Sequence, residues 1–322
     1  MDIAAKAAVD LDDASANGGA AMTDRPRRIL VTGGSGFLGR HLCRALVGAG
    51  FAGRIVTLDG VPSDAVAADG VDALVGDVRD VALVTHCLAG VDLVFHLAGI
   101  ADPRACERDP ARAHAVNVDG TATLVAASAG RRLVLLSSAA VYAAGATVPL
   151  DERAAVSDAS VYAATKLAAE RLCLAATHAG RLAAIVVRNF NTYGAGQAPV
   201  FLVPELIGRG LRDGHVRVAS CRPVRDFTYV DDTVAALVAL GLHATPGEIF
   251  NLGSGRATAV GDVALALGGL LGLPVSCAHH AVTGNPRVVA ATAKLRSAIG
   301  WEPRVALDDG LARTVAGTHG AT

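Results

Sequence analysis

Tyr162 and Lys166 lie four residues apart in the segment VYAATKLAAE (Val161–Glu170), and this pair suits acid–base chemistry on a hydroxyl group. On a helix, residues at this spacing share one face, one turn apart. An ordinary tyrosine titrates at about pH 10, and a neighbouring ammonium lowers that pKa because it favours the phenolate. Tyr162 could then exchange a proton with a substrate hydroxyl at neutral pH. A purely structural helix pair is the alternative, because Tyr-x-x-x-Lys also arises by chance.

Ser138 offers a second hydroxyl for the same chemistry. It follows the apolar run Leu133–Ser137, which we expect to be a strand, so Ser138 would stand at the carboxyl edge of a sheet. From there its hydroxyl could share the substrate oxygen with Tyr162. The alternative is a serine that only satisfies groups at the end of its own strand.

A glycine-rich turn in LVTGGSGFLG (Leu30–Gly39) predicts where a dinucleotide would be held. Gly33 makes the tight turn after an apolar strand, Gly36 lets a pyrophosphate approach the backbone, and Gly39 lets helix and strand pack closely. The N-terminus of the following helix then offers unpaired N–H groups to the phosphates. A glycine-rich loop without a ligand is the alternative, because the chain contains 36 glycines.

Asp59 favours NAD as that dinucleotide. It closes the next apolar strand, Ile55–Leu58, and lies 20 residues after Gly39. A carboxylate there accepts hydrogen bonds from the adenosine ribose hydroxyls and repels a 2′-phosphate. No Arg or Lys occurs between Asp59 and Val78, so NADP is disfavoured. Asp77, in the segment GDVRD, could hydrogen-bond the adenine amino group or cap the following helix, and the two roles are compatible.

The order of elements predicts the scaffold that positions these residues. Apolar runs alternate with alanine-rich helical stretches, which is typical of an α/β fold with a Rossmann-type, doubly wound parallel sheet. We expect strands at Arg28–Thr32, Arg54–Leu58, Ala73–Gly76, Leu93–Leu97, Leu133–Ser137 and Ala184–Arg188. We expect helices at Arg40–Gly48, Val81–Cys87, Arg112–Ala127, Val161–Thr177 and Phe201–Asp213.

The chain divides into three expected parts. Residues 1–26 are rich in Ala, Asp and Gly and are expected to be a disordered leader, with Met22 a candidate natural start. Residues 27–190 form an NAD-binding domain that also holds the catalytic residues. Residues 191–322 form mainly a smaller substrate-binding region, interleaved with the first domain and folded over the carboxyl edge of the sheet. Within it we expect helices at Asp231–Leu240 and Gly261–Leu271 and a strand at Ile249–Leu252.

Composition argues against several other classes of protein. The 322 residues include 29 basic and 30 acidic ones, for a net charge of −1, so nothing suggests nucleic acid as a partner. The uncharged stretch Leu133–Leu150 contains serines, a glycine and a proline, which predicts a buried strand entering a loop, and no membrane span. The six cysteines are scattered without a C-x-x-C pair, so we expect no metal site, no disulfide framework and a cytoplasmic location.

The assembled pattern resembles the extended short-chain dehydrogenase/reductase family, in particular its NAD-dependent nucleotide-sugar epimerase and dehydratase branch. The resemblance runs from about Arg27 to Thr314, and its motifs stand in family order. They are TGGSGFLG, VFHLAG (Val94–Gly99), NVDGT (Asn117–Thr121), SSAAVY (Ser137–Tyr142), YAATK, RNFNTYGAGQ (Arg188–Gln197), RDFTYVDD (Arg225–Asp232), NLGSG (Asn251–Gly255) and IGWEP (Ile299–Pro303).

The resemblance implies a catalytic triad of Ser138, Tyr162 and Lys166, in which Lys166 also holds the nicotinamide ribose. The positive nicotinamide ring would add to the Lys166 ammonium in lowering the Tyr162 pKa. It implies NAD as the cofactor and a homodimer formed through the helices at Arg112–Ala127 and Val161–Thr177. The residues it assigns to the cofactor are Gly33, Gly36, Phe37, Leu38, Gly39, Asp59, Asp77, Val78, Leu97, Ala98, Gly99, Asn117, Tyr162 and Lys166.

The resemblance also implies a nucleotide-diphosphate sugar as the substrate. Asn191 would contact the sugar diphosphate and Arg225 the pyrophosphate, a task that suits a bidentate guanidinium. A surface ion pair with Asp226 is the alternative for Arg225. The segment around Leu202 and Val203 would close over the nucleotide base.

Two departures from the family pattern bear on the reaction. Dehydratases and decarboxylases of this branch carry an acidic residue after the catalytic hydroxyl, whereas this chain has Ala139 and Ala140, so dehydration is disfavoured. Many relatives also carry an Arg before a Gly-Asp pair near the C-terminus, as a second clamp on the diphosphate. Here Asn285 stands in place of Asp without that Arg, and Arg287, His279 or His280 are the candidate substitutes.

These observations favour an NAD-dependent nucleotide-sugar 4-epimerase, with a UDP-hexose as substrate. A nucleotide-sugar 4-ketoreductase of a deoxysugar pathway is the nearest alternative, because the Ser-Tyr-Lys set serves it equally. Asp59 counts against it, since such reductases often prefer NADPH. A non-catalytic NAD-binding scaffold is the third hypothesis, although such proteins commonly lose the tyrosine that this chain retains.

Overall fold

The computed structural model describes residues 26–51, 55–62, 70–281 and 284–319. The expected leader, including Met22, therefore lies outside the described residues except for Pro26. Arg54, the first residue of one expected strand, lies outside them as well.

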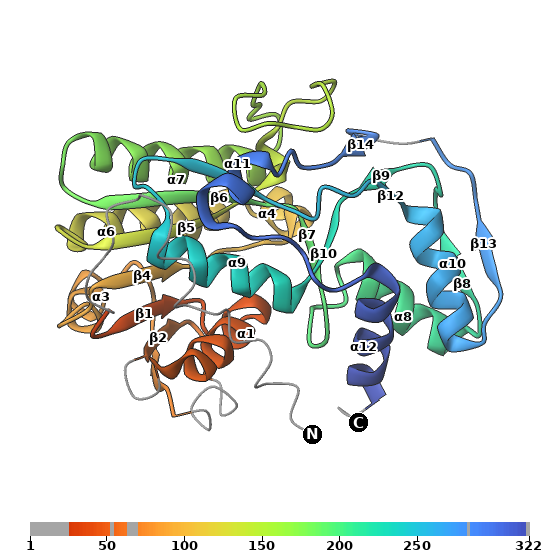
Figure 1. Cartoon of the computed structure of the whole chain (residues 1–322), viewed down its shortest axis with the longest axis horizontal. Coiled ribbons are helices and arrows are strands. Elements are labelled where there is room, and N and C mark those ends of the chain that lie inside the picture. The colour runs from red at the N-terminus through yellow and green to blue at the C-terminus, as the bar shows by residue number, and fades with distance from the viewer. Residues whose placement is uncertain (1–25, 52–54, 63–69, 282–283, 320–322) are drawn as a thin grey trace.

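Within the described residues, seven parallel strands form the central sheet in the order β11-β6-β5-β4-β1-β2-β3 (Figure 1). The chain builds outward from β1 to β3 and then returns to the other side of β1 to add β4, and ligands bind at such a switch point. The expected doubly wound α/β fold is confirmed. The strands are β1 (Ile29–Thr32), β2 (Ile55–Asp59), β3 (Asp72–Val75), β4 (Leu93–His96), β5 (Arg132–Ser138), β6 (Ala183–Asn189) and β11 (Ile249–Leu252).

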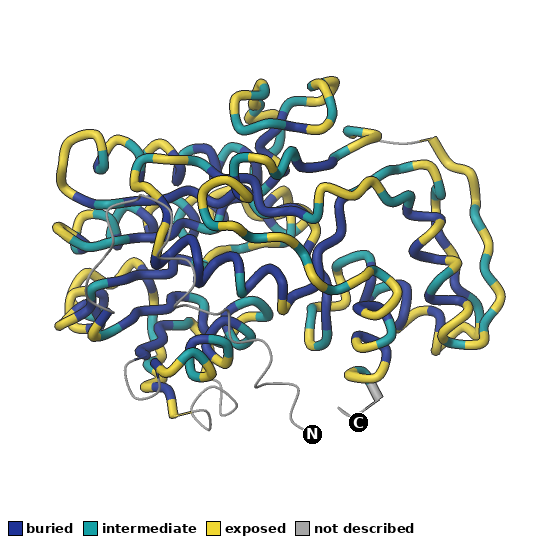
Figure 2. Tube along the Cα trace, viewed as in Figure 1, coloured by how far each residue is buried: buried dark blue, intermediate teal, exposed yellow. Residues whose placement is uncertain are grey.

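Helices cover both faces of this sheet because its strands are apolar on both sides. Ile29 and Val31 of β1 pack in one core cluster, and Leu30 between them packs in the other, as strand geometry requires. The first cluster includes helices α1 (Phe37–Leu46) and α9 (Val230–His243). The second is covered by α3 (Val81–Cys87), α6 (Gly120–Ala127) and α7 (Val161–His178). Figure 2 shows the resulting continuous buried layer along the sheet.

A smaller region lies beside the carboxyl ends of the sheet strands, at the right of Figure 1. It is built on α8 (Leu202–Asp213), α10 (Val260–Leu271) and α12 (Leu307–His319). Its short strands pair as β12-β9-β14, β13-β8 and β10-β7. Their bounds are β7 (Asn191–Tyr193), β8 (Val216–Val218), β9 (Val224–Arg225), β10 (Phe227–Tyr229), β12 (Thr258–Ala259), β13 (Val275–Cys277) and β14 (Arg287–Val288).

Most expected elements occur within one to three residues of their expected bounds, and the differences are informative. The expected helix Arg112–Ala127 is divided into α5 (Pro110–His114), a wider π-type turn at Ala115–Asp119, and α6. Helices α4 (Pro103–Arg108) and α11 (Ala293–Ile299) were not expected. Ile249–Leu252 has the expected bounds, but it is the seventh strand of the main sheet, paired with β6. No helix of the described residues is long and apolar enough to cross a membrane.

Candidate active site

The glycine turn between β1 and α1 has the close packing that a bound dinucleotide needs. Gly33 has a φ of +76°, and a Cβ there would lie 2.7 Å from the backbone nitrogen of Ala98. A Cβ on Gly39 would overlap the carbonyl oxygen of Gly33. Helix and strand therefore approach this closely only because both residues are glycine.

The first turn of α1 presents backbone donors at this position. Gly36 is the N-cap residue, and no side chain caps the helix there. The N–H groups of Phe37 and Leu38 have no acceptor within the helix, because the first-turn donors of any α-helix lack one. Such donors, together with the helix dipole, suit a phosphate group.

Asp59 lies beside the same turn. Its carboxylate accepts a hydrogen bond from the backbone N–H of Ser35 at 2.9 Å. The backbone N–H of Gly33 donates to the carbonyl of Leu58, at 2.8 Å, and so joins the turn to β2. The glycine cradle, the open helix terminus and this fixed carboxylate together fit an adenosine diphosphate group of NAD.

The helix-capping role expected for Asp77 is wrong, because Asp80 caps α3 instead. The carboxylate of Asp80 accepts the N–H of Leu83 at 3.0 Å. Asp77 forms a two-pronged ion pair with Arg79, and this hydrogen-bonded guanidinium lowers the pKa of the Asp77 carboxyl. Asp77 is exposed and ionised, and the adenine contact expected for it stays a prediction.

The segment after β4 brings further expected cofactor residues to the glycine turn. Leu97 and Ala98 donate their N–H groups to the backbone and side-chain oxygens of Thr32, at 3.0 and 3.3 Å. A Cβ on Gly99 would lie 2.9 Å from the side-chain oxygen of Asn117. Val78, also expected to contact the cofactor, is buried in the core cluster that α3, α6 and α7 cover.

Asn117 stands in the π-type turn and links this segment to the catalytic helix. Its side-chain oxygen accepts the N–H of Ile100 at 2.7 Å, and its amide nitrogen donates to the hydroxyl of Thr165 at 3.0 Å. Asn117 is 3% exposed, so these bonds form out of contact with water. Turns of this type recur at functional sites because they turn one side chain out of the helical ladder.

Ser138, Tyr162 and Lys166 come together at the carboxyl edge of β5. Ser138 ends β5, and Tyr162 and Lys166 lie one turn apart on α7. The Ser138 side chain favours the Tyr162 phenolate, and its hydroxyl oxygen also accepts the N–H of Ala140 at 3.1 Å, at the end of its own strand. The Lys166 ammonium donates to the carbonyl of Leu136 at 3.0 Å. Helix α7 starts here because Ser160 caps it by accepting the N–H of Ala163, at 3.1 Å.

The expected lowering of the Tyr162 pKa relied on the Lys166 ammonium and the positive nicotinamide ring together, and the chain by itself does not show it. Burial raises the pKa of Tyr162, and the Ser138 side chain only partly offsets that effect. Burial also lowers the pKa of Lys166 to about 8, because an ammonium loses hydration there. The Lys166 charge is directed to a backbone carbonyl, so a further positive charge near Tyr162 is needed to favour the phenolate.

Arg225 and Asp226 do not form the ion pair offered as the alternative role for Arg225. The buried carboxylate of Asp226 accepts hydrogen bonds from the N–H and from the hydroxyl of Ser254, both at 2.6 Å. It also accepts the N–H of Gly255 at 2.9 Å and the N–H of Ala290 at 3.1 Å. The half-buried guanidinium of Arg225 donates to the carbonyls of Val224 and Pro286.

The other expected substrate residues differ in their accessibility. Asn191 is exposed, and its side-chain amide donates to the carbonyl of Asp226 at 3.2 Å, which places it next to the Arg225 strand. Leu202 is half-buried at the start of α8. Val203 is 2% exposed and packs in the hydrophobic core, so its side chain is turned away from any ligand.

Arg287 is exposed on β14, which pairs in parallel with β9. The register sets Arg287 opposite Val224 and Val288 opposite Arg225. Because paired residues of neighbouring strands point to the same face, Arg287 and Arg225 point to opposite faces. This register does not bring the two guanidinium groups together as a clamp.

His96 is a buried residue near the cofactor turn to which the sequence analysis gave no role. Its Nδ1 lies 2.7 Å from the hydroxyl of Thr32, and its Nε2 lies 2.9 Å from that of Thr121. Thr32 already accepts the N–H of Ala98, and Thr121 donates to the carbonyl of Asn117. The ring is therefore neutral, with its hydrogen on Nε2, and burial lowers its pKa to about 3. The motif VFHLAG, in which His96 stands, is the sequence feature that could have identified this residue.

Comparison with known proteins places this arrangement among enzymes that act on nucleotide sugars. The model of the NAD dependent epimerase/dehydratase family matches residues 29–253. A UDP-glucose 4-epimerase of Mycolicibacterium smegmatis is 32% identical, over 89% of this chain and 97% of the relative. A dTDP-glucose 4,6-dehydratase of Streptomyces niveus is 31% identical, over 89% and 91%. A GDP-6-deoxy-D-mannose reductase of Pseudomonas aeruginosa is 28% identical, over 88% and 95%.

A solved structure, that of MoeE5 in complex with UDP-glucose and NAD, superposes with a TM-score of 0.82 at 30% identity. The superposition covers 91% of this chain and 99% of MoeE5. The similarity therefore extends over both the main sheet and the smaller region.

Proposed function

The chain belongs to the NAD dependent epimerase/dehydratase family, with NAD as its cofactor, and within that family we propose that it is a nucleotide-sugar 4-epimerase acting on a UDP-hexose. The observation that carries the proposal is the placement of Ser138 at the end of β5 together with Tyr162 and Lys166 one turn apart on α7, where Lys166 is held by the carbonyl of Leu136 on β5. The domain boundary at residue 190 is part of the same proposal.

In this proposal Tyr162 takes the proton from the 4-hydroxyl of the sugar while Ser138 holds the same oxygen. Bound NAD supplies a positively charged hydride acceptor, which also provides the charge that favours the Tyr162 phenolate. Lys166 is fixed by the Leu136 carbonyl and keeps further N–H donors for the adjoining ribose. Tyr162 then returns the proton to the 4-oxygen after the 4-keto sugar has rotated so that its opposite face is reduced.

Dehydration is disfavoured by the two residues that follow Ser138. Ala139 is buried and Ala140 exposed in a short 3₁₀ turn after β5, and neither side chain can carry a proton. A dehydratase requires a further acid or base at this edge of the sheet to remove water across C5 and C6. The alanines therefore favour a reaction that is confined to oxidation and reduction at C4.

The experiment is proton NMR of the purified protein, without added cofactor, with UDP-glucose, UDP-N-acetylglucosamine, UDP-glucuronate and a dTDP-hexose in turn. We expect the anomeric signal of the C4 epimer with one of the UDP sugars, and none with Tyr162→Phe. Conversion of a 4-keto sugar only on addition of NADH or NADPH would replace the epimerase by a 4-ketoreductase. No conversion of any sugar under either condition would favour the non-catalytic scaffold.

We also propose a cytoplasmic homodimer formed through α6 and α7. A surface groove of about 600 Å³ lies between these helices, lined mainly by small apolar residues such as Ala122, Ala126, Ala168 and Ala175. Small side chains let helices of a second copy approach closely. Sedimentation of Ala168→Arg should give a monomer if this face forms the interface, whereas an unchanged dimer would place the interface elsewhere.

A further inference from the structure

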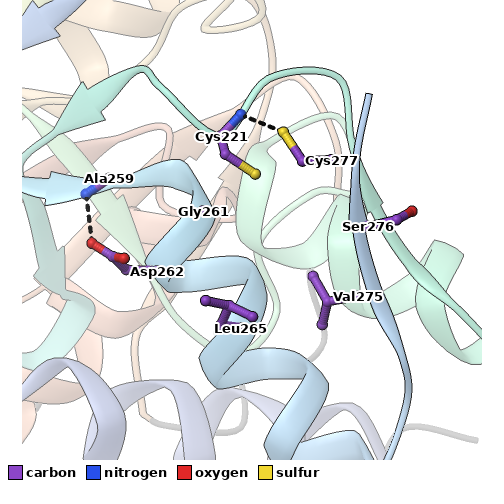
Figure 3. A pocket seen from close by; sticks show the side chains of 8 residues that line it. All are labelled: Cys221, Ala259, Gly261, Asp262, Leu265, Val275, Ser276 and Cys277. Carbon is purple, nitrogen blue, oxygen red and sulfur yellow. Dashed lines mark hydrogen bonds between the residues drawn. The ribbon is translucent and has the colours of Figure 1, made fainter. Parts of the chain in front are cut away.

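A second group of reactive side chains lies in the smaller region, away from the glycine turn. Cys221 and Cys277 line a cavity of about 290 Å³ together with Leu265 and Val275 (Figure 3). Cys221 precedes β9, and Cys277 ends β13, 56 residues later. Both thiols are free and half-buried, whereas Cys43, Cys87, Cys106 and Cys173 are buried.

The sulfur of Cys277 is surrounded by backbone donors. The N–H of Cys221 donates to it at 2.9 Å, and the backbone N–H of His279 also favours its thiolate. His279 has a φ of +55°, a left-handed conformation that side-chain-bearing residues rarely adopt. Such backbone strain persists where the surrounding contacts require it and is concentrated at functional sites.

Cys221 is held rigidly against the first turn of α10. A Cβ on Gly261 would lie 2.9 Å from the Cβ of Cys221, and the N–H of Gly261 donates to the Cys221 carbonyl at 3.2 Å. On the other side, β13 is fixed to β8, with Cys277 paired to Val218. The two thiols are therefore set next to each other by separate, well-packed elements.

The two sulfurs differ in character. Hydrogen bonds from the Cys221 thiol and from the N–H groups of His279 and Cys221 lower the pKa of Cys277, with Arg222 adding to the effect. Burial and then the neighbouring Cys277 raise the pKa of Cys221. A thiolate is the reactive form of cysteine, so Cys277 is the attacking group and Cys221 the second, resolving thiol.

We propose that Cys221 and Cys277 form a reversible dithiol–disulfide site that reacts with low-molecular-weight disulfides. The Cys277 thiolate attacks one sulfur of the small disulfide, forms a mixed disulfide and releases one small thiolate. Cys221 gives its proton to solvent and attacks the Cys277 sulfur, which releases the second small thiolate. The cysteine pair is oxidised and the small disulfide is reduced to two thiols, and excess thiol reverses the exchange.

The test is peptide mapping of the whole protein with its NAD after incubation with oxidised glutathione. Trypsin separates the two cysteines, because Cys221 lies in the peptide 218–225 and Cys277 in the peptide 257–287. We expect these two peptides to be joined, with the loss of two hydrogen atoms, and to separate again with dithiothreitol. The four buried cysteines serve as internal controls and should remain free.

Serine variants identify the order of attack. Cys221→Ser should hold glutathione on Cys277 as a lasting mixed disulfide. Cys277→Ser should react with glutathione disulfide at least about tenfold more slowly at Cys221. Recovery of both wild-type peptides as free thiols, a lasting mixed disulfide in the wild type, or a link to another cysteine would each overturn the proposal. The wild-type map decides the matter even if a serine variant fails to fold.

Discussion

Around the glycine turn the backbone itself forms the site, whereas around Arg225 side chains and short strands form it. Gly33 and Gly39 permit approaches that no other residue allows, and Asp59 is fixed by the Ser35 backbone. The Arg225 guanidinium, in contrast, donates to two carbonyls of its own region, on a strand of two residues. The cofactor side is therefore built in advance. We propose that the region around Arg225 is the substrate side, where side-chain donors can exchange partners when a diphosphate binds.

The comparison predicts that chemistry and cofactor retention can be separated most sharply at Tyr162. We expect Tyr162→Phe to lower kcat by about 10²–10⁴-fold, because phenylalanine cannot carry the proton. The amount of NAD that copurifies should not change, since the glycine turn is untouched. Tyr229→Phe, at a buried tyrosine of the smaller region, is the matched control. A loss of copurified NAD from Tyr162→Phe as large as its loss of kcat would contradict this separation of chemistry from cofactor retention.

Gly39→Ala should break the cofactor side. The new methyl group would meet the Gly33 carbonyl and force the helix from the strand, at a cost of about 1–3 kcal/mol. We expect at least about tenfold less bound NAD, measured by absorbance of the released cofactor. Gly208→Ala in α8 is the control, because its Cβ meets no atom within 4 Å and it should add about 0.5–1 kcal/mol of helix stability.

Arg225→Ala should affect the substrate side alone. Loss of charged hydrogen bonds worth about 1.5–3 kcal/mol predicts a KM for the nucleotide sugar that is about 10–100-fold higher, with NAD content unchanged. Arg287→Ala should raise KM by less, because the β14 register directs Arg287 to the opposite face. Steady-state kinetics on both variants checks the assignment, and a larger effect at Arg287 would reverse it.

His96 predicts a smaller, pH-dependent effect on the cofactor side. Its pKa is about 3 when folded, below the ordinary value of 6.5, so the unfolded chain binds the proton more readily. Stability is therefore complete above pH 6.5 and falls as the pH falls toward 3, by up to about 1.4 kcal/mol per pH unit. Urea unfolding across this window should show that the free energy of unfolding of His96→Gln depends less steeply on pH than that of the wild type. His178→Gln, at a residue whose ring is exposed, should keep the wild-type pH dependence.

The sequence predicted those parts of the site that depend on local spacing. Glycines three residues apart, Asp59 after its strand, and Tyr162 four residues before Lys166 keep their relation within one or two elements. The true contacts of Asp226 could not be predicted in this way, because Ser254, Gly255 and Ala290 meet it only through the tertiary fold. The burial that raises the pKa of Tyr162 could not be predicted for the same reason, since it depends on the elements packed over this residue.

Two errors were nonetheless open to local reasoning. Asp80 stands directly before the helix in GDVRD and is the better capping residue, while Asp77 is one turn too early. The expected helix Arg112–Ala127 begins two residues too late, because Asp109 and Pro110 together signal the start of α5. The π-type turn after it has no comparable signal, because its geometry depends on the buried bonds of Asn117.

The position of α9 against α1 has a consequence for how the protein is synthesised. Leu42 and Leu46 of α1 share a core cluster with Leu237 of α9, and β11 completes the sheet later still. Chains emerge from the ribosome with the N-terminus first, so the helix that receives the phosphates keeps an uncovered apolar face until residues 230–252 have been made. The glycine turn, although it lies near the start of the chain, can become stable only when most of the chain has left the ribosome.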